Sequence, residues 1–428
     1  MTLRPAPCER PLAADESPSD PAECSQRRYR AIMTAAILGS SIAFIDGSIV
    51  SVALPAIREG LGASLAEMQW VINGYALMLA AFILPAGSAG DVFGRKRVFL
   101  IGVAVYTLAS LWCGLARSGP ELIVARIVEG VGGAFMIPAS LALITVNVPK
   151  DRRGAAIGLW AAAGAASTAI GPILGGTLID TFGWRPALLL TVPFGVATFL
   201  VAWRGVPESR AEGAHMDWTG GVLACLGLGA LAYALTVAAG GLTLSVVALS
   251  VAGLVLLGIF LWQQYRATDP MMPLGLFKSR PFSGANGLTF LLYAALTGVL
   301  FLMPMTLIDA HGYSATQAGL ALLPFTILVG ALSRYSGGLA DRMGARLPLS
   351  LGPAIVALAF ASLVWVALDG GFWTAVVPAM VLLGAGMGIT VAPLSTTIMN
   401  AVADEKAGTA SGVNNAVSRA AGLIAVAA

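Results

Sequence analysis

Three ionisable residues stand inside long apolar stretches, where a charge is costly. Asp46 lies within residues 31–57, and Arg126 and Glu129 lie within residues 120–148. A charged side chain in the middle of a bilayer costs about 3 kcal/mol or more unless it pairs or reaches water, so such residues usually mark proton or ion pathways. We therefore take Asp46 as a candidate proton carrier, Arg126 as its counter-charge and Glu129 as a second acceptor. A static salt bridge that positions two helices is the alternative.

The depth of these residues within their segments agrees with a pairing. Asp46 follows the start of its segment by about 15 residues, or about 22 Å at 1.5 Å per residue. Arg126 is about 6 residues from the start of an oppositely running segment, which places it about 20 Å from the far face of a hydrocarbon core about 30 Å thick. Glu129 is three positions further along and shares the helix face of Arg126. A carboxylate that gains and loses a nearby arginine can change its proton affinity between two states of a protein.

The elements that carry these residues must lie in a membrane. Of 428 residues, 57% are hydrophobic and 11% are charged, whereas soluble domains carry about 25% charged residues. Inside hydrocarbon only helices and closed barrels satisfy their own backbone hydrogen bonds. The apolar runs are long and unbroken, unlike the short alternating segments of a barrel. We predict an all-α membrane protein.

Several other function classes lack their residues. The chain has two histidines, no Gly-Lys pair for a Walker A loop and no Gly-x-Ser-x-Gly nucleophile motif. Its four cysteines show no disulfide or zinc spacing. We therefore expect no enzymatic activity, no cofactor, no metal and no nucleic-acid partner. The expected partners are the lipid bilayer, protons and an amphipathic small molecule, and the expected state is a monomer.

Thirteen apolar segments are long enough to cross a bilayer, since each crossing needs about 20 residues. They are residues 31–57, 66–89, 97–116, 120–148, 153–180, 185–204, 218–239, 243–265, 282–308, 316–340, 347–368, 372–400 and 408–428. Residues 1–30 have the composition of a disordered cytoplasmic tail. The last segment stops at Ala428 without a polar flank, so we expect one further span to be missing.

Basic residues predict the orientation of these spans. With the tail inside the cell, nineteen of the 25 Lys and Arg residues fall in the tail and the inner loops, and three fall in outer loops. Cytoplasmic loops of membrane proteins retain Lys and Arg. The N-terminus is therefore expected in the cytoplasm.

A repeated motif divides the chain into two related parts. Gly87, Asp91, Gly94 and Arg95 form Gly-x-x-x-Asp-x-x-Gly-Arg at the inner end of the second span, and the same spacing returns 250 positions later with Gly337, Asp341 and Gly344, where Arg342 adds a basic charge. Such internal repeats are typical of transporters with two halves around a central site. We predict a first half at 31–204, a linker with two extra spans at 205–281, and a second half at 282–428 with five spans.

Together these motifs make the chain resemble the major facilitator superfamily, and within it the fourteen-span drug:H⁺ antiporter branch. The loop motif departs from the family pattern at Ala89 and Val92, and in the fourth span Glu129 stands where Gln is common. The remaining matches, quoted as they stand, are Lys96, Leu339, Arg126 with Gly130, Gly171-Pro172, Gly175-Gly176, Asp46-Gly47-Ser48 and Ala53-Leu54-Pro55. The resemblance covers nearly everything from residue 31 onward.

The resemblance implies a proton-coupled exporter of drugs, antibiotics or related metabolites that works by alternating access at the cytoplasmic membrane. Gly164, Gly171 and Gly175 fall on one face of the fifth span, where small residues allow close helix packing, and Pro172 bends that helix. In the family this motif accompanies export. A proton-coupled metabolite importer and a truncated, non-transporting membrane protein are the alternatives.

Two further sets of residues receive roles under this interpretation. Asp91 is expected to accept hydrogen bonds from the amides of the helix that begins near Gly408, and Asp341 those of the helix near Gly154, as latches that hold the cytoplasmic side shut. Aromatic, amide and methionine side chains on the second and ninth spans are expected to line the substrate cavity, because such residues adapt to varied shapes. They are Trp70, Asn73, Tyr75, Met78, Phe290 and Tyr293.

Overall fold

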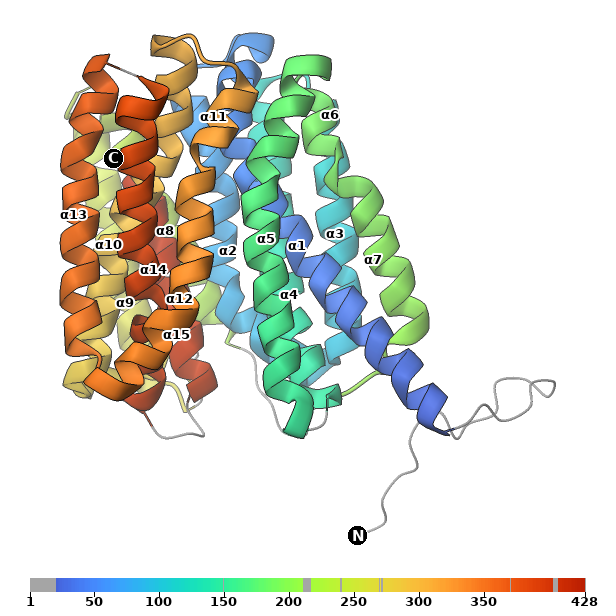
Figure 1. Ribbon diagram of the computed structural model, residues 1–428. Helices are drawn as coiled ribbons and strands as arrows, with labels where there is room; N and C mark the ends of the chain where they lie inside the picture. Colours follow the sequence, from blue (N-terminus) through green and yellow to red (C-terminus); the bar gives the residue numbers. More distant parts are fainter. Residues whose placement is uncertain are drawn as a thin grey trace.

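The computed structural model describes residues 21–148, 150–210, 217–238, 241–268, 270, 272–369, 371–402 and 407–427 (Figure 1). Throughout these ranges the chain forms helices and turns, and they contain no β-strand. The prediction of an all-α protein is confirmed. The helices run roughly side by side as one bundle, with the start of α1 at its lower end in Figure 1.

The first part of the chain supplies seven helices. They are α1 (Pro21–Leu61), α2 (Leu65–Phe93), α3 (Arg95–Leu115), α4 (Gly119–Asn147), α5 (Lys150–Phe182), α6 (Trp184–Leu189) and α7 (Thr191–Gly205). Within this set α4 packs against α2 and α3, while α1 packs against α5, α7 and α4. The predicted span 185–204 is divided between α6 and α7, which meet at Leu190.

The second part of the chain contains a helix pair and a further set of helices. The pair is α8 (Trp218–Ala238) and α9 (Leu244–Arg266), which pack on each other, and α8 also contacts α2 and α15. The set comprises η3 (Leu274–Lys278), α10 (Arg280–Met305), η4 (Thr306–Ala310), α11 (Ala315–Ala321), α12 (Leu323–Met343), α13 (Arg346–Asp369), η5 (Phe372–Val376), α14 (Val377–Asn400) and α15 (Ala407–Ala427). We propose, as the repeated motif predicts, that residues 31–204 and 282–428 are two halves and that residues 205–281 link them.

Eleven stretches of the described residues are long and apolar enough to cross a membrane. They coincide with eleven of the thirteen predicted spans. Helices α2 and α15 occupy the two remaining predicted positions, 66–89 and 408–428. Each predicted span therefore corresponds to a helix or to two helices in succession.

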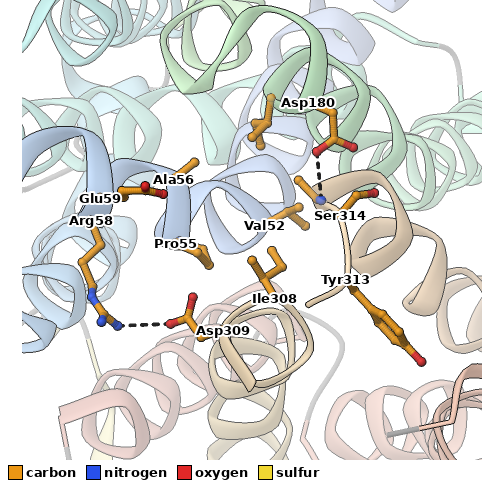
Figure 2. A pocket seen from close by; sticks show the side chains of 12 residues that line it. Val52, Pro55, Ala56, Arg58, Glu59, Asp180, Ile308, Asp309, Tyr313 and Ser314 are labelled. Atoms are coloured by element: carbon orange, nitrogen blue, oxygen red, sulfur yellow. Dashed lines mark hydrogen bonds and ion pairs between the residues drawn. The ribbon is translucent and has the colours of Figure 1, made fainter. Parts of the chain in front are cut away.

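The two halves meet closely at the end of the bundle where α1 ends and α2 begins, which we call the distal end. A cavity of about 450 Å³ opens there between them (Figure 2). Its walls are Val52, Pro55, Ala56, Arg58 and Glu59 of α1, Ile179 and Asp180 of α5, and Ile308, Asp309, Tyr313, Ser314 and Ala315 of the second half. Elsewhere α15 packs along α2, so the halves are also joined through this helix pair.

Gly94 makes the turn between α2 and α3 and leaves room for a carboxylate. Its φ is +105°, a conformation that L-residues other than glycine rarely adopt. Glu208, from the segment after α7, accepts hydrogen bonds from the backbone N–H groups of Lys96 (3.1 Å) and Arg97 (3.2 Å) at the start of α3. A Cβ at Gly94 would lie 2.6 Å from Oε1 of Glu208. Gly94 of the repeated motif thus leaves room for the carboxylate of Glu208, which caps α3.

Replacement of Gly94 by alanine is expected to destabilise the protein. The positive φ alone costs a non-glycine residue about 1–2 kcal/mol, and the collision with Glu208 weakens the cap of α3 as well. The measurement is the fraction of protein that remains monodisperse in detergent after heating. Gly258→Ala in α9 is the control, because its Cβ would meet nothing within 4 Å. Equal stability of the two variants would contradict the role given to Gly94.

Candidate functional site

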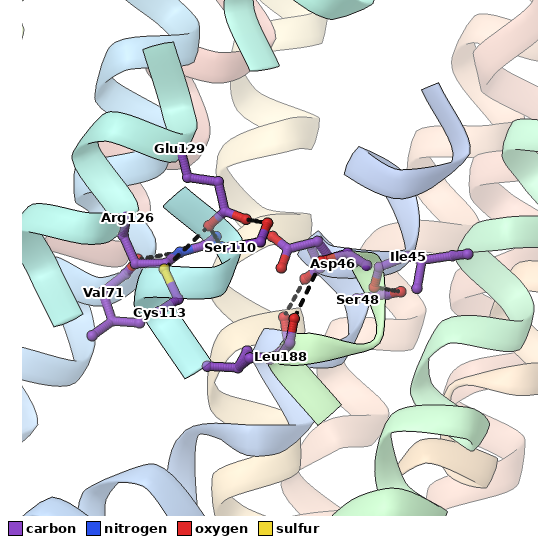
Figure 3. Close-up of polar contacts among 12 residues, drawn as sticks. Ile45, Asp46, Ser48, Val71, Ser110, Cys113, Arg126, Glu129 and Leu188 are labelled. Carbon is purple, nitrogen blue, oxygen red and sulfur yellow. Dashed lines mark hydrogen bonds and ion pairs between the residues drawn. The ribbon is translucent and has the colours of Figure 1, made fainter. Parts of the chain in front are cut away.

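A single arginine binds two carboxylates in the interior of the first half (Figure 3). Nη1 of Arg126 on α4 lies 2.7 Å from Oδ2 of Asp46 on α1 and 2.5 Å from Oε2 of Glu129 on its own helix. Asp46 and Arg126 are each 2% exposed and Glu129 is 0% exposed. The structure therefore brings together the three ionisable residues that the sequence singles out. Their part in proton coupling stays a prediction.

Helix α2 fixes the arginine from a second direction. Nε of Arg126 donates to the carbonyl oxygen of Val71 at 3.2 Å. The ring of Tyr75, one turn further along α2, lies beneath the guanidinium with its centroid 4.5 Å from Cζ, a cation–π contact. The rings of Tyr75 and Tyr106 of α3 form a T-shaped pair with their centroids 6.5 Å apart. Because several groups hold its guanidinium, Arg126 is set in one place while its two carboxylates compete for it.

Helix α3 contributes two donors to Glu129 that the sequence gives no reason to select. The hydroxyl of Ser110 donates to Oε1 at 2.5 Å, and the thiol of Cys113 donates to Oε2 at 3.5 Å. Both side chains are buried. Their spacing of three positions puts them on one face of α3, but only the packing of α3 on α4 aims that face at Glu129. Glu129 therefore has three donors, whereas the guanidinium is the donor to the Asp46 side chain among the described residues.

The charge of this cluster is unbalanced when all three groups are ionised. Two carboxylates face one guanidinium, which leaves one negative charge in a site that water barely reaches. An uncompensated buried charge costs several kcal/mol in effective terms. One bound proton would remove it. The geometry is therefore suited to taking up and releasing a single proton.

The glycines of α5 set the position of the α1 segment that carries Asp46. A Cβ on Gly164 would lie 2.9 Å from the ring of Phe44, one on Gly171 would lie 3.1 Å from the carbonyl oxygen of Ile45, and one on Gly175 would lie 2.8 Å from Ile49. This predicted small-residue face therefore packs on α1 within the first half. The carbonyl of Pro172 instead faces Gly319 of α11, so α5 also touches the second half.

The six residues predicted to line a substrate cavity do not form one group. Tyr75 belongs to the charge cluster. Trp70 packs on Tyr233 of α8 with ring centroids 6.0 Å apart, and Met78 lies in the same apolar cluster. Asn73 is 0% exposed, and neither its amide oxygen nor its nitrogen has a hydrogen-bond partner among the described residues.

The two α10 residues of this set differ from each other. Phe290 is 37% exposed, whereas Tyr293 is partly buried and packs against the largest apolar core. Their assignment to a substrate cavity stays a prediction for both.

The predicted latch residues are described only in part. Gly87 and Asp91 lie in α2, and Asp341 and Arg342 lie in α12, but the side chains at these positions are outside the described residues. Arg95 begins α3, and its backbone N–H donates to the carbonyl of Ser209 at 2.9 Å. Gly344 adopts a φ of +82°, a turn conformation comparable to that of Gly94.

Comparison with known proteins places this architecture in a family. A family profile described as Major Facilitator Superfamily matches residues 36–426. The chain belongs to the Major Facilitator Superfamily. The match includes the charge cluster, the α5 glycines and all of the second half up to α15.

Relatives of this chain in the superfamily carry names that refer to drug and antibiotic resistance. It is 34% identical over 383 residues to the multidrug resistance protein Stp of Mycobacterium tuberculosis, a match that covers 89% of this chain and 71% of Stp. It is 33% identical to the tetracenomycin C resistance and export protein of Streptomyces glaucescens, covering 92% and 74% of the two chains. It is 32% identical to the methylenomycin A resistance protein of Bacillus subtilis, covering 91% and 84%. The chain is a multi-pass membrane transporter.

Solved structures of superfamily transporters share the fold. A bacterial homologue of the human lysosomal transporter Spinster superposes with a TM-score of 0.67 at 17% identity, covering 95% of this chain and 82% of that one. A D-xylose–proton symporter superposes with a TM-score of 0.65 at 14% identity, covering 93% and 89%. These identities are low, so the comparison establishes the fold alone. The predicted major facilitator bundle is confirmed.

Removal of the central cation is expected to harm folding more than removal of the whole charged cluster. Arg126→Met leaves two buried carboxylates without their partner, and breaking a buried ion pair costs about 3–5 kcal/mol. The triple variant Asp46→Asn, Arg126→Met, Glu129→Gln leaves no charge behind and should recover much of that loss. The amount of monodisperse protein and its melting temperature in detergent measure the effect. A triple variant less stable than Arg126→Met would contradict this account of the cluster.

Proposed function

We propose that this transporter exports amphipathic small molecules, such as drugs or antibiotics, across the cytoplasmic membrane in exchange for protons. The resistance names of its relatives support the substrate class. The observation that carries the proton coupling is the guanidinium of Arg126 shared between Asp46 and Glu129. The excess of Lys and Arg in the predicted inner loops supports a cytoplasmic N-terminus.

Asp46 is the better candidate for the exchanging carboxyl group. Glu129 receives hydrogen bonds from Ser110 and Cys113 in addition to Arg126, and it shares a helix with the arginine. Asp46 lies on another helix, so a change in its contact with Arg126 moves one helix relative to another. Protonation of Asp46 would remove its attraction to the guanidinium and leave Arg126 paired with Glu129.

Helix α1 is placed to turn that local change into a movement of the halves. It packs on α5 through the Phe44–Ile49 segment, and it also contacts α10 and α11 of the second half. A loss of the Asp46 contact would free α1 to shift along the α5 glycines. We propose that this shift alternates the opening of the two sides, as two-state transport requires.

Tyr75 would connect the proton site to the transported molecule. Its ring contacts Arg126, and it was predicted, with Trp70, Asn73, Met78, Phe290 and Tyr293, to line the substrate cavity. A substrate that displaces the ring would alter the surroundings of the guanidinium directly. The repeated Gly-x-x-x-Asp motifs would hold the cytoplasmic side closed, and the transporter would act as a monomer.

Asp46→Asn is expected to abolish transport driven by a pH gradient while the amount of folded protein stays unchanged. An amide can still accept a hydrogen bond from Arg126, but it cannot take up a proton at physiological pH. The measurement is accumulation of a cationic fluorescent dye, ethidium, in inside-out membrane vesicles after acidification of their interior. Glu59→Gln is the matched control, because it neutralises an exposed carboxylate at the distal end of the same helix.

The same experiment distinguishes the alternatives. Export requires dye to enter the inside-out vesicles when their interior is acidic, whereas a proton-coupled importer would carry its substrate out of them with the protons. Dye accumulation by Asp46→Asn equal to that of the parent would end the proposed coupling. Absence of pH-driven dye movement by the parent would count against export of this class of molecule.

A further inference from the structure

We propose that Asp180 on α5 is a latch residue that holds the distal side of the transporter closed by capping the first turn of α11 in the other half. The proposal rests on the division into two halves and on alternating access, but not on proton coupling or on the identity of the substrate. It concerns a carboxylate far from the charge cluster, at the opposite end from the repeated motifs.

Both oxygens of the Asp180 side chain are used for this contact. Oδ1 accepts the backbone N–H of Ala315 at 3.0 Å (Figure 2). Oδ2 accepts the backbone N–H of Thr316 at 2.9 Å. These amides belong to the first turn of a helix, where backbone N–H groups have no partner in the helix itself. A carboxylate there is further favoured by the positive end of the helix dipole. The contact between the halves therefore joins a charged carboxylate on α5 to backbone N–H groups on α11.

The backbone of α5 approaches α11 closely at the same place. A Cβ on Gly176 would lie 2.5 Å from the carbonyl oxygen of Ala315 and 2.7 Å from Cα of Thr316. A Cβ on Gly319 of α11 would in turn collide with the carbonyl of Pro172. The two glycines thus let the helices touch along about one turn, with Asp180 just beyond it. Such contact requires the distal ends of the halves to be together.

A second, weaker connection crosses the same cavity. Nη1 of Arg58 at the end of α1 lies 3.1 Å from Oδ2 of Asp309 in η4. Their side chains are 44% and 42% exposed, and exposed pairs contribute little to stability. Glu59 borders the cavity beside Arg58, but its side chain makes no hydrogen bond or ion pair to the described residues of the second half. The cavity therefore contains the two hydrogen bonds of Asp180, one exposed ion pair, and one carboxylate that serves as an internal control.

An open distal side cannot keep these bonds. Separation of α5 from α11 breaks both hydrogen bonds of Asp180, and it opens the space lined by Val52, which is 0% exposed in this structure. Without Asp180 the open state should be populated more often. The expected size is about threefold or more, in the range that loss of a helix cap produces.

Labelling of a cysteine at position 52 tests this directly. The full-length protein with Val52→Cys is reconstituted in lipid nanodiscs and reacted with a membrane-impermeant maleimide, and the reaction of the protein without that cysteine is subtracted. Asp180→Ala is expected to raise the labelling rate about threefold or more. Glu59→Gln, which removes a carboxylate from the same cavity, is expected to leave the rate unchanged.

A pair of glycine variants tests the same interface without changing a charge. Gly176→Ala pushes α5 away from α11 and should also raise the labelling rate. Gly258→Ala in α9 is its control, because its Cβ would meet nothing within 4 Å. If Asp180→Ala does not fold, Asp180→Asn takes its place, since the amide keeps one acceptor oxygen and should give an intermediate increase.

The proposal is overturned if Asp180 variants label at the parent rate, or if Glu59→Gln raises the rate as much as they do. It is also overturned if the cysteine at position 52 reacts in none of the variants. These outcomes are independent of the dye experiment, because labelling requires neither substrate nor a pH gradient. If labelling follows the expected pattern but no dye is transported, the latch proposal is supported and the proposed export is contradicted.

Discussion

The competition of two carboxylates for one buried guanidinium is the constraint on which the rest of the first half depends. Arg126 cannot be moved far, because Val71 and Tyr75 of α2 hold it, and it cannot be left alone, because an unpaired cation in hydrocarbon is too costly. In this structure Asp46 pairs with it, and that ion pair positions α1. Glu129 must be satisfied as well, which fixes α3 through Ser110 and Cys113. Four helices are ordered around one side chain.

The small residues of α5 allow α1 to pack closely against it. The glycines that face Phe44, Ile45 and Ile49 leave no room for larger side chains at this contact. This is the contact along which we propose that α1 moves. Neighbouring positions on α5 contact the second half. Helix α5 thus packs against α1 and also forms part of the boundary between the halves.

Much of this organisation follows from the sequence, because hydrocarbon allows so few alternatives. Counting 1.5 Å per residue along two oppositely running spans places Asp46 and Arg126 at the same depth, and their ion pair confirms it. Glu129 follows from helical periodicity. The span positions follow from the length of the apolar runs, although the division of one span into α6 and α7 gives no clear sequence signal.

The remaining features depend on how helices are rotated about their axes, which periodicity alone does not determine in a helix that is apolar all round. Ser110 and Cys113 look like ordinary polar and apolar positions until α3 is packed on α4. The 37% exposure of Phe290 likewise depends on the rotation of α10, which its sequence does not reveal. No sequence pattern marks Glu208 or Asp180, because their partners are backbone amides, which are the same at every position except proline.

That last property bears on how such a contact could evolve in a transporter. A bridge between two side chains can be lost by mutation at either end and regained by a compensating change at the other. A contact with the main chain can be changed by mutation on the side-chain partner only, since almost any amino acid at positions 315 and 316 presents the same N–H groups. Selection that tunes the lifetime of the closed distal side would therefore act on position 180 and on the glycines around it, while the facing surface drifts freely.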